Sequence, residues 1–229
     1  MMKSSRHQDT QVLRKRGVIA FTLVEILVVI VVIAILAGIA LPLFTSTSVK
    51  GKLTQNLSNA KTVGLGLRLY AADHKGLFPA SATSANAAYR FIVPNYIPTQ
   101  KVFFLANSGW CTGSQPVEYG PTGTLAAGQN NYAYVSGLTD SDNVDYPLLA
   151  DGFNDGAPRV YNSVKGTKGG IWSGTKAVVV RVDDSAEILP VAGSDFKVHS
   201  NGIKSGNANT DIFTTSATWM PSGTVLNPE

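Results

Sequence analysis

The sequence predicts an α+β protein, in which a long N-terminal helix packs on a small antiparallel β-sheet head with long loops. An unbroken apolar run over 21–44 is followed by apolar residues at helical spacing up to about residue 72. From Leu77 onward, short apolar runs alternate with Gly/Ser/Thr-rich stretches, as in strands joined by turns. Apolar residues make up 44% of the chain and charged residues 15%, which excludes a disordered or coiled-coil protein.

The net charge of +4 comes from the first 20 residues. Residues 1–20 hold five basic side chains and one acid, so the remaining 14 basic and 14 acidic side chains of 21–229 cancel. Because no excess of basic charge remains outside this short leader, nucleic acid is disfavoured as the main partner.

The apolar run 21–44 reads FTLVEILVVIVVIAILAGIALPLF and has one charge, Glu25. As a helix it would be about 36 Å long, enough to cross a hydrocarbon core of about 30 Å. It is about twice as long as the apolar part of a secretory signal peptide, which favours a retained anchor. The basic leader predicts a cytoplasmic N-terminus, with the chain after Phe44 on the outside.

Glu25 needs an explanation, because a carboxylate in an apolar setting is costly unless it is paired. One interpretation is an assembly role with a positively charged partner. The alternative is that Glu25 sits at the membrane surface in the first helical turn, where a negative charge is mildly favourable.

The segment Phe21-Thr22-Leu23-Val24-Glu25, behind Arg14-Lys15-Arg16 and ahead of an apolar helix, resembles the N-terminus of type IV pilins and type II secretion pseudopilins. The resemblance is strong over 14–44 and weakens beyond about residue 80. It implies that a prepilin peptidase cuts between Ala20 and Phe21, and that Phe21 is then N-methylated. The family usually has Gly before the cut, where this chain has Ala20. The resemblance also implies that Glu25 of one subunit meets the Phe21 amine of its neighbour.

The resemblance implies a domain order: a cleaved leader (1–20), a transmembrane or filament-core helix (21–44), its amphipathic outer half (45–75) and a β-rich head (76–229). The expected function is that of a structural subunit of a type IV pilus-like filament, and not of an enzyme. A type II secretion pseudopilin is preferred, since the single Cys111 allows no pilin-style disulfide. An adhesive or motility type IV pilin is one alternative.

The resemblance also implies partners and a location. The partners would be copies of the chain, other pilin-like subunits, the prepilin peptidase, an inner-membrane assembly platform and the lipid bilayer. The protein would lie in the bacterial inner membrane with its head in the periplasm, and after assembly in a periplasmic or cell-surface filament. A second alternative is a membrane-tethered binding module for a surface polymer, which would use exposed aromatics such as Trp110, Trp172 and Trp219.

The outer half of the helix should bury one face against the head, because apolar residues recur there every three or four positions. These residues are Val49, Leu53, Leu57, Ala60, Gly64, Leu67 and Ala71. The helix should end at 73–76, with Gly76 in a left-handed cap position. Pro42 lacks the N–H that would bond the Gly38 carbonyl, which predicts a kink or local melting near these two residues.

The head should contain five strands, at 101–105, 131–135, 146–150, 176–182 and 187–191. The last two flank Asp183-Asp184-Ser185, whose residue types favour a hairpin turn.

No set of residues has the spacing of a recognisable catalytic or metal site. His74 is expected to contact the last carbonyls of the helix or to be solvated, His199 to be a loop residue, and Cys111 to be buried and inert. Asp140, Asp142 and Asp145 place oxygen ligands at alternate positions, a weak calcium candidate. They lack the position-six Gly and the terminal Glu of an EF-hand, so a solvated turn is preferred.

Overall fold

The computed structural model describes residues 22–81, 83–116, 125–200, 210–216 and 219–229, and within them it leaves the side chains of 40–46 undescribed. Ala20 and Phe21, the predicted cleavage site, therefore lie outside the described residues. The chain divides into two compact units, Met1–Val49 and Lys50–Glu229.

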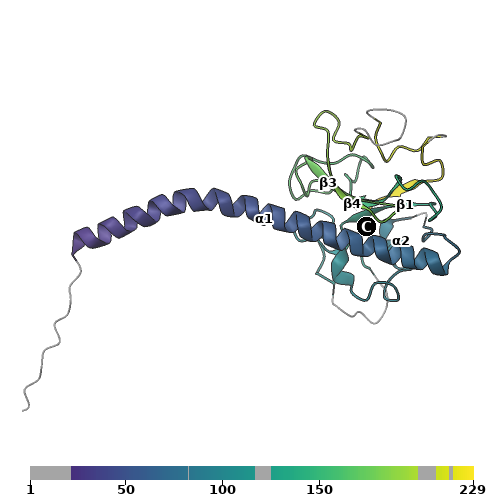
Figure 1. The fold of residues 1–229 in the computed structure, drawn as a ribbon, viewed down its shortest axis with the longest axis horizontal. Coiled ribbons are helices and arrows are strands. Elements are labelled where there is room, and N and C mark those ends of the chain that lie inside the picture. Colours follow the sequence, from purple (N-terminus) through teal and green to yellow (C-terminus); the bar gives the residue numbers. More distant parts are fainter. Residues whose placement is uncertain (1–21, 82, 117–124, 201–209, 217–218) are drawn as a thin grey trace, which may run out of the picture. The chain divides into compact units, whose positions relative to one another are not determined.

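One helix supplies the described part of the first unit and continues into the second. This helix, α1, spans Leu23–Asp73, 51 residues, which confirms the prediction of a single helix to about residue 72 (Figure 1). It continues through Gly38 and Pro42, so the predicted local melting is not seen, while a kink stays a prediction. Across the part of the chain that the structure describes, no helix is both long and apolar enough to cross a membrane.

The second unit contains one five-stranded antiparallel sheet, which confirms the α+β class. The strand order is β4-β3-β2-β1-β5. Four predicted strands are confirmed to within a few residues at their ends. The strands are β1 (Tyr132–Ser136), β2 (Pro147–Asp151), β3 (Lys176–Arg181), β4 (Ala186–Pro190) and β5 (Thr224–Leu226).

The predicted hairpin between β3 and β4 is also confirmed. Asp184 adopts φ +68° in the turn, and the Ser185 amide donates to the Asp183 carboxylate (2.9 Å). Short polar side chains tolerate this left-handed conformation better than most, which explains an aspartate pair at this turn.

The strand predicted at 101–105 is wrong, because this segment forms a 3₁₀ helix, η1 (Gln100–Phe103). The Thr99 hydroxyl accepts a hydrogen bond from the Lys101 amide and caps η1. A short apolar run cannot be assigned to strand or helix from its periodicity alone. Two further elements were not predicted: β5, which has only three residues, and α2 (Ala85–Tyr89), which follows the N-cap Ser84.

Within the second unit, α1 lays one face on the sheet (Figure 1). Predicted face residues Leu53, Ala60, Leu67 and Ala71 are buried, and Val63 joins them. Leu57, also on the predicted face, is only partly buried. For Val49, at the end of the first unit, the prediction is wrong, since its side chain is 47% exposed.

Two glycines of α1 allow this close packing. A Cβ at Gly64 would lie 2.8 Å from the Val180 side chain of β3, and one at Gly66 would lie 2.5 Å from the Ile97 side chain. These glycines therefore do more than weaken the helix, because they let the backbone of α1 approach the head.

The helix ends as predicted. The Gly76 amide donates to the Ala71 carbonyl (2.8 Å), and Gly76 has φ +80°, the left-handed conformation that glycine adopts at no steric cost.

Candidate assembly site

The first turn of α1 carries a capping box formed by Thr22 and Glu25. The Thr22 backbone amide and its hydroxyl both donate to Glu25 Oε2, at 2.9 and 2.7 Å. In return, the Glu25 amide donates to the Thr22 hydroxyl oxygen (3.2 Å). This reciprocal pattern of Thr at the N-cap and Glu three residues later satisfies amides that the helix itself cannot bond.

The capping box gives Glu25 a partner inside its own chain, which the sequence interpretation had not identified. The signal was present, since Thr-x-x-Glu before an apolar run is the capping-box pattern. It accounts for the acid on local grounds and keeps the alternative of a first-turn role open. The Phe21 amine lies outside the described residues, so pairing of Glu25 with a neighbouring subunit stays a prediction.

Behind the capping box, the side chains over 26–39 are apolar and exposed. From 23 to 39, the large apolar side chains are between 48% and 80% exposed. Water disfavours so much apolar surface, and a patch of this extent normally meets lipid or another protein chain.

The acidic residues weighed as calcium ligands form a turn. Asp142 accepts hydrogen bonds from the Thr139 amide (2.6 Å) and hydroxyl (3.0 Å), and the Asn143 side chain accepts from the Asp145 amide (3.0 Å). Asp140 accepts from the Ser141 hydroxyl. Among the residues that the structure describes, no group of three or more His, Cys, Asp or Glu side chains could hold a metal ion.

His74 and His199, the two histidines among the described residues, take local roles. His74 Nδ1 lies 2.8 Å from the Tyr70 carbonyl, and its ring stacks on Tyr70 with the centroids 3.8 Å apart. It contacts a carbonyl of the last helical turn, as expected. His199 lies in an irregular segment, where Nε2 is 2.8 Å from the Asp195 carboxylate.

Cys111 is buried, as predicted, and its sulfur accepts a hydrogen bond from the Leu105 amide (3.3 Å). Burial raises the pKa of the thiol to about 11. At pH 8 only about one thiol in a thousand would then be a thiolate, the reactive form.

We therefore expect Cys111 to resist iodoacetamide at pH 8 in the folded head and to react quickly once denaturant unfolds it. Mass spectrometry of the alkylated protein, with and without denaturant, measures this difference. Equal alkylation rates in both states would contradict the buried position.

The three tryptophans predicted as polymer-binding candidates lie in the hydrophobic core or against it. Trp110 and Trp219 are buried, and their indole N–H groups donate to the Phe153 carbonyl (2.8 Å) and the Ile212 carbonyl (2.9 Å). Trp172 is half-buried and donates to the Asp151 carboxylate (2.7 Å). Trp110 and Trp219 are therefore core residues, and Trp172 packs against the core from its edge.

A buried carboxylate that was not predicted as a site connects α1 to the sheet. Asp151, at the end of β2, is 0% exposed and accepts four hydrogen bonds. Asn56 of α1 donates to Oδ1 (2.6 Å), as does Asn131 (2.8 Å), and Oδ2 accepts from Trp172 and from the Val178 amide (2.9 Å). This network, the Asp151 junction, fixes the helix on the strands through polar contacts with defined directions.

Burial raises the pKa of Asp151, whereas its hydrogen bonds favour the ionised form and oppose that effect. The Asn56 side-chain oxygen accepts from the Tyr132 hydroxyl (2.8 Å), which orients the amide toward the carboxylate.

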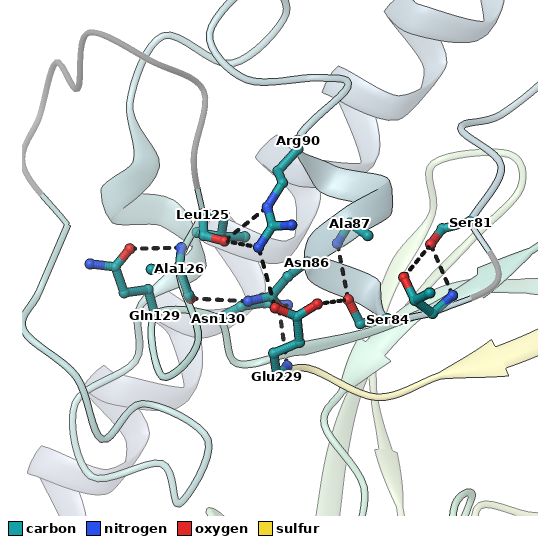
Figure 2. Close-up of polar contacts among 11 residues, drawn as sticks. Ser81, Ser84, Asn86, Ala87, Arg90, Leu125, Ala126, Gln129, Asn130 and Glu229 are labelled. Carbon is teal, nitrogen blue, oxygen red and sulfur yellow. Dashed lines mark hydrogen bonds and ion pairs between the residues drawn. The ribbon is translucent and has the colours of Figure 1, made fainter.

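A second polar cluster joins the C-terminal residue to α2. Figure 2 shows the Glu229 carboxylate between Ser84, whose hydroxyl donates to it, and Arg90, which approaches within 3.2 Å. The Arg90 guanidinium also donates to the Leu125 carbonyl at 3.0 Å. The cluster binds β5 and the residues after it to the rest of the head.

Comparison with protein-family models, curated proteins and solved structures finds no match to this chain.

Proposed function

We propose that the chain is a structural subunit of a type IV pilus-like filament, in which α1 assembles with the helices of other copies. One observation carries the proposal. The segment that resembles a prepilin processing site leads directly into a helix whose large apolar side chains over 23–39 are 48–80% exposed.

Assembly would bury these exposed apolar side chains. Parallel helices packed along a filament axis bury apolar side chains, and the bilayer would serve the same purpose for subunits before assembly. On this proposal, prepilin peptidase removes residues 1–20 at the bacterial inner membrane, the head lies in the periplasm, and Phe21 and Glu25 guide subunits into register.

Within this class, we favour a type II secretion pseudopilin over an adhesive or motility pilin. The single Cys111 is buried and cannot close a disulfide-bonded surface loop in its own head. The polymer-binding alternative loses support, since Trp110 and Trp219 lie in the core.

Mass spectrometry of the membrane-extracted protein tests the proposal. The expected N-terminus is Phe21, about 14 Da heavier than the bare residue because of one methyl group. Processing should stop when Phe21→Asp is introduced, while Val49→Asp, far from the cut, should be processed normally. An intact Met1 leader, or a cut beyond Phe44, would contradict the proposal.

A further inference from the structure

Four aromatic side chains gather on the surface of the second unit, around the end of α1. The rings of His74, Phe91 and Tyr96 lie around that of Tyr70, with centroids 3.8, 6.3 and 5.6 Å from it. Phe91 is 53% exposed and His74 is also exposed, while Tyr70 and Tyr96 are half-buried. These four residues, which we call the Tyr70 cluster, therefore present aromatic surface to the outside.

A carboxylate borders these rings. The Tyr96 hydroxyl donates to Asp73 Oδ2 (3.0 Å), which holds the carboxylate beside the Tyr96 ring. Asp73 is exposed, and no basic side chain of the described residues forms an ion pair with it. The nearest arginines in the sequence are engaged elsewhere, since Arg68 donates to a backbone carbonyl (2.8 Å) and Arg90 pairs with Glu229 (3.2 Å). The charge of Asp73 is therefore available to a positively charged group from outside.

The same head contains a completed arrangement of this kind. Lys168 Nζ lies 4.2 Å from the centroid of the Trp110 ring and 2.7 Å from the Asp155 carboxylate. One cation there contacts an aromatic ring and an acid at once, and both contacts favour a positive charge. Among the residues that the structure describes, the Tyr70 cluster has the rings and the acid but no such cation.

We infer that the Tyr70 cluster and Asp73 receive an arginine side chain of a partner protein. A guanidinium group stacks on aromatic rings and donates paired hydrogen bonds to a carboxylate, so it suits both parts of this surface. A quaternary ammonium would interact with the rings but has no N–H to donate to Asp73. Because Asp73 and Phe91 are exposed, the surface suits a side chain carried by a docked protein better than a small molecule, which a site normally encloses. The inference does not depend on the proposed filament function.

Ligand-observed NMR on the full chain in detergent micelles, at pH 8, tests the inference. The probe is N-acetylarginine amide, and N-acetylcitrulline amide is the control, since citrulline has nearly the same shape without the charge. The citrulline probe should bind about tenfold more weakly, because it loses the cation–π contact and the ion pair together. No binding of the arginine probe would overturn the inference. Equal affinity for the two probes would also overturn it, and would indicate a surface that stacks neutral groups such as sugars.

Two substitutions test where the arginine binds. Asp73→Asn removes the charge but keeps an oxygen acceptor for the Tyr96 hydroxyl, and Phe91→Leu removes the ring but keeps an apolar side chain. Each should weaken binding of the arginine probe about two- to fivefold, as expected for one exposed ion pair or cation–π contact. Asp155→Asn is the matched control, because Asp155 is exposed but already pairs with Lys168, and it should bind the probe like the wild type. Unchanged affinity in Asp73→Asn or in Phe91→Leu would overturn the inference.

Discussion

Asp151→Ala is expected to lower the free energy of unfolding of the head by about 3–5 kcal/mol, because it leaves four donors, three of them buried, without an acceptor. Urea unfolding followed by tryptophan fluorescence measures the effect, since Trp172 contacts the carboxylate directly. A loss of this size is a large part of the stability of a typical domain.

Asp155→Ala is the matched control. Asp155 lies four residues further along the chain and pairs with Lys168 at 2.7 Å, where its side chain is 63% exposed. Exposed ion pairs contribute about 0–1 kcal/mol, so the control should unfold close to the wild type. Equal losses for the two variants would contradict the role of the Asp151 junction.

The stability of the wild type and that of Asp151→Ala should depend differently on pH. Since burial raises the pKa of Asp151 above its unfolded value near 3.8, the native state takes up the proton more readily. The contribution of this group to stability is therefore complete below the unfolded pKa, and it falls as pH rises through the native pKa. The wild type should gain stability relative to Asp151→Ala as the pH is lowered toward 4.

Glu25→Gln is expected to abolish filament assembly while leaving the start of α1 intact. Glutamine can replace glutamate in a capping box, because its side-chain oxygen still accepts from the Thr22 amide and hydroxyl. The substitution removes only the charge that would meet the Phe21 amine of a neighbouring copy. The measurement is the amount of the variant in sheared or detergent-resistant filaments, relative to wild type.

Thr22→Ala is the complementary variant. It removes the hydroxyl that caps the helix, at a cost of about 1 kcal/mol, but it keeps the carboxylate charge. If the charge pairing drives assembly, this variant should still enter filaments in amounts close to wild type. The reverse outcome, with Glu25→Gln assembling and Thr22→Ala failing, would mean that Glu25 acts only as a helix cap.

The long helix and four of the strands could be predicted because their patterns are local. Apolar spacing along α1 and the β-branched run of β3 each identify an element without reference to the rest of the chain. The 3₁₀ helix η1 was mistaken for a strand, since its apolar residues are too few to show a period. The short strand β5 depends on pairing with β1, far away in the sequence, and that pairing leaves no local signal.

The polar sites likewise include one that the sequence could predict and one that it could not. The capping box was readable as Thr-x-x-Glu in the sequence, because both partners lie within one helical turn. The Asp151 junction was not readable, since Asn56 and Asp151 are 95 residues apart and each looks ordinary in its own segment. A buried carboxylate is recognised only when the fold shows what donates to it.

The glycines of α1 affect what stabilises the helical conformation of residues 50–73. Gly51, Gly64 and Gly66 each destabilise the helix by about 1 kcal/mol relative to alanine. At Gly64 and Gly66 the neighbouring side chains lie too close for any larger residue. A peptide covering 50–73 alone would then be mostly unfolded in water. This half of the helix is therefore stabilised mainly by its packing on the sheet, so helix and sheet must fold cooperatively.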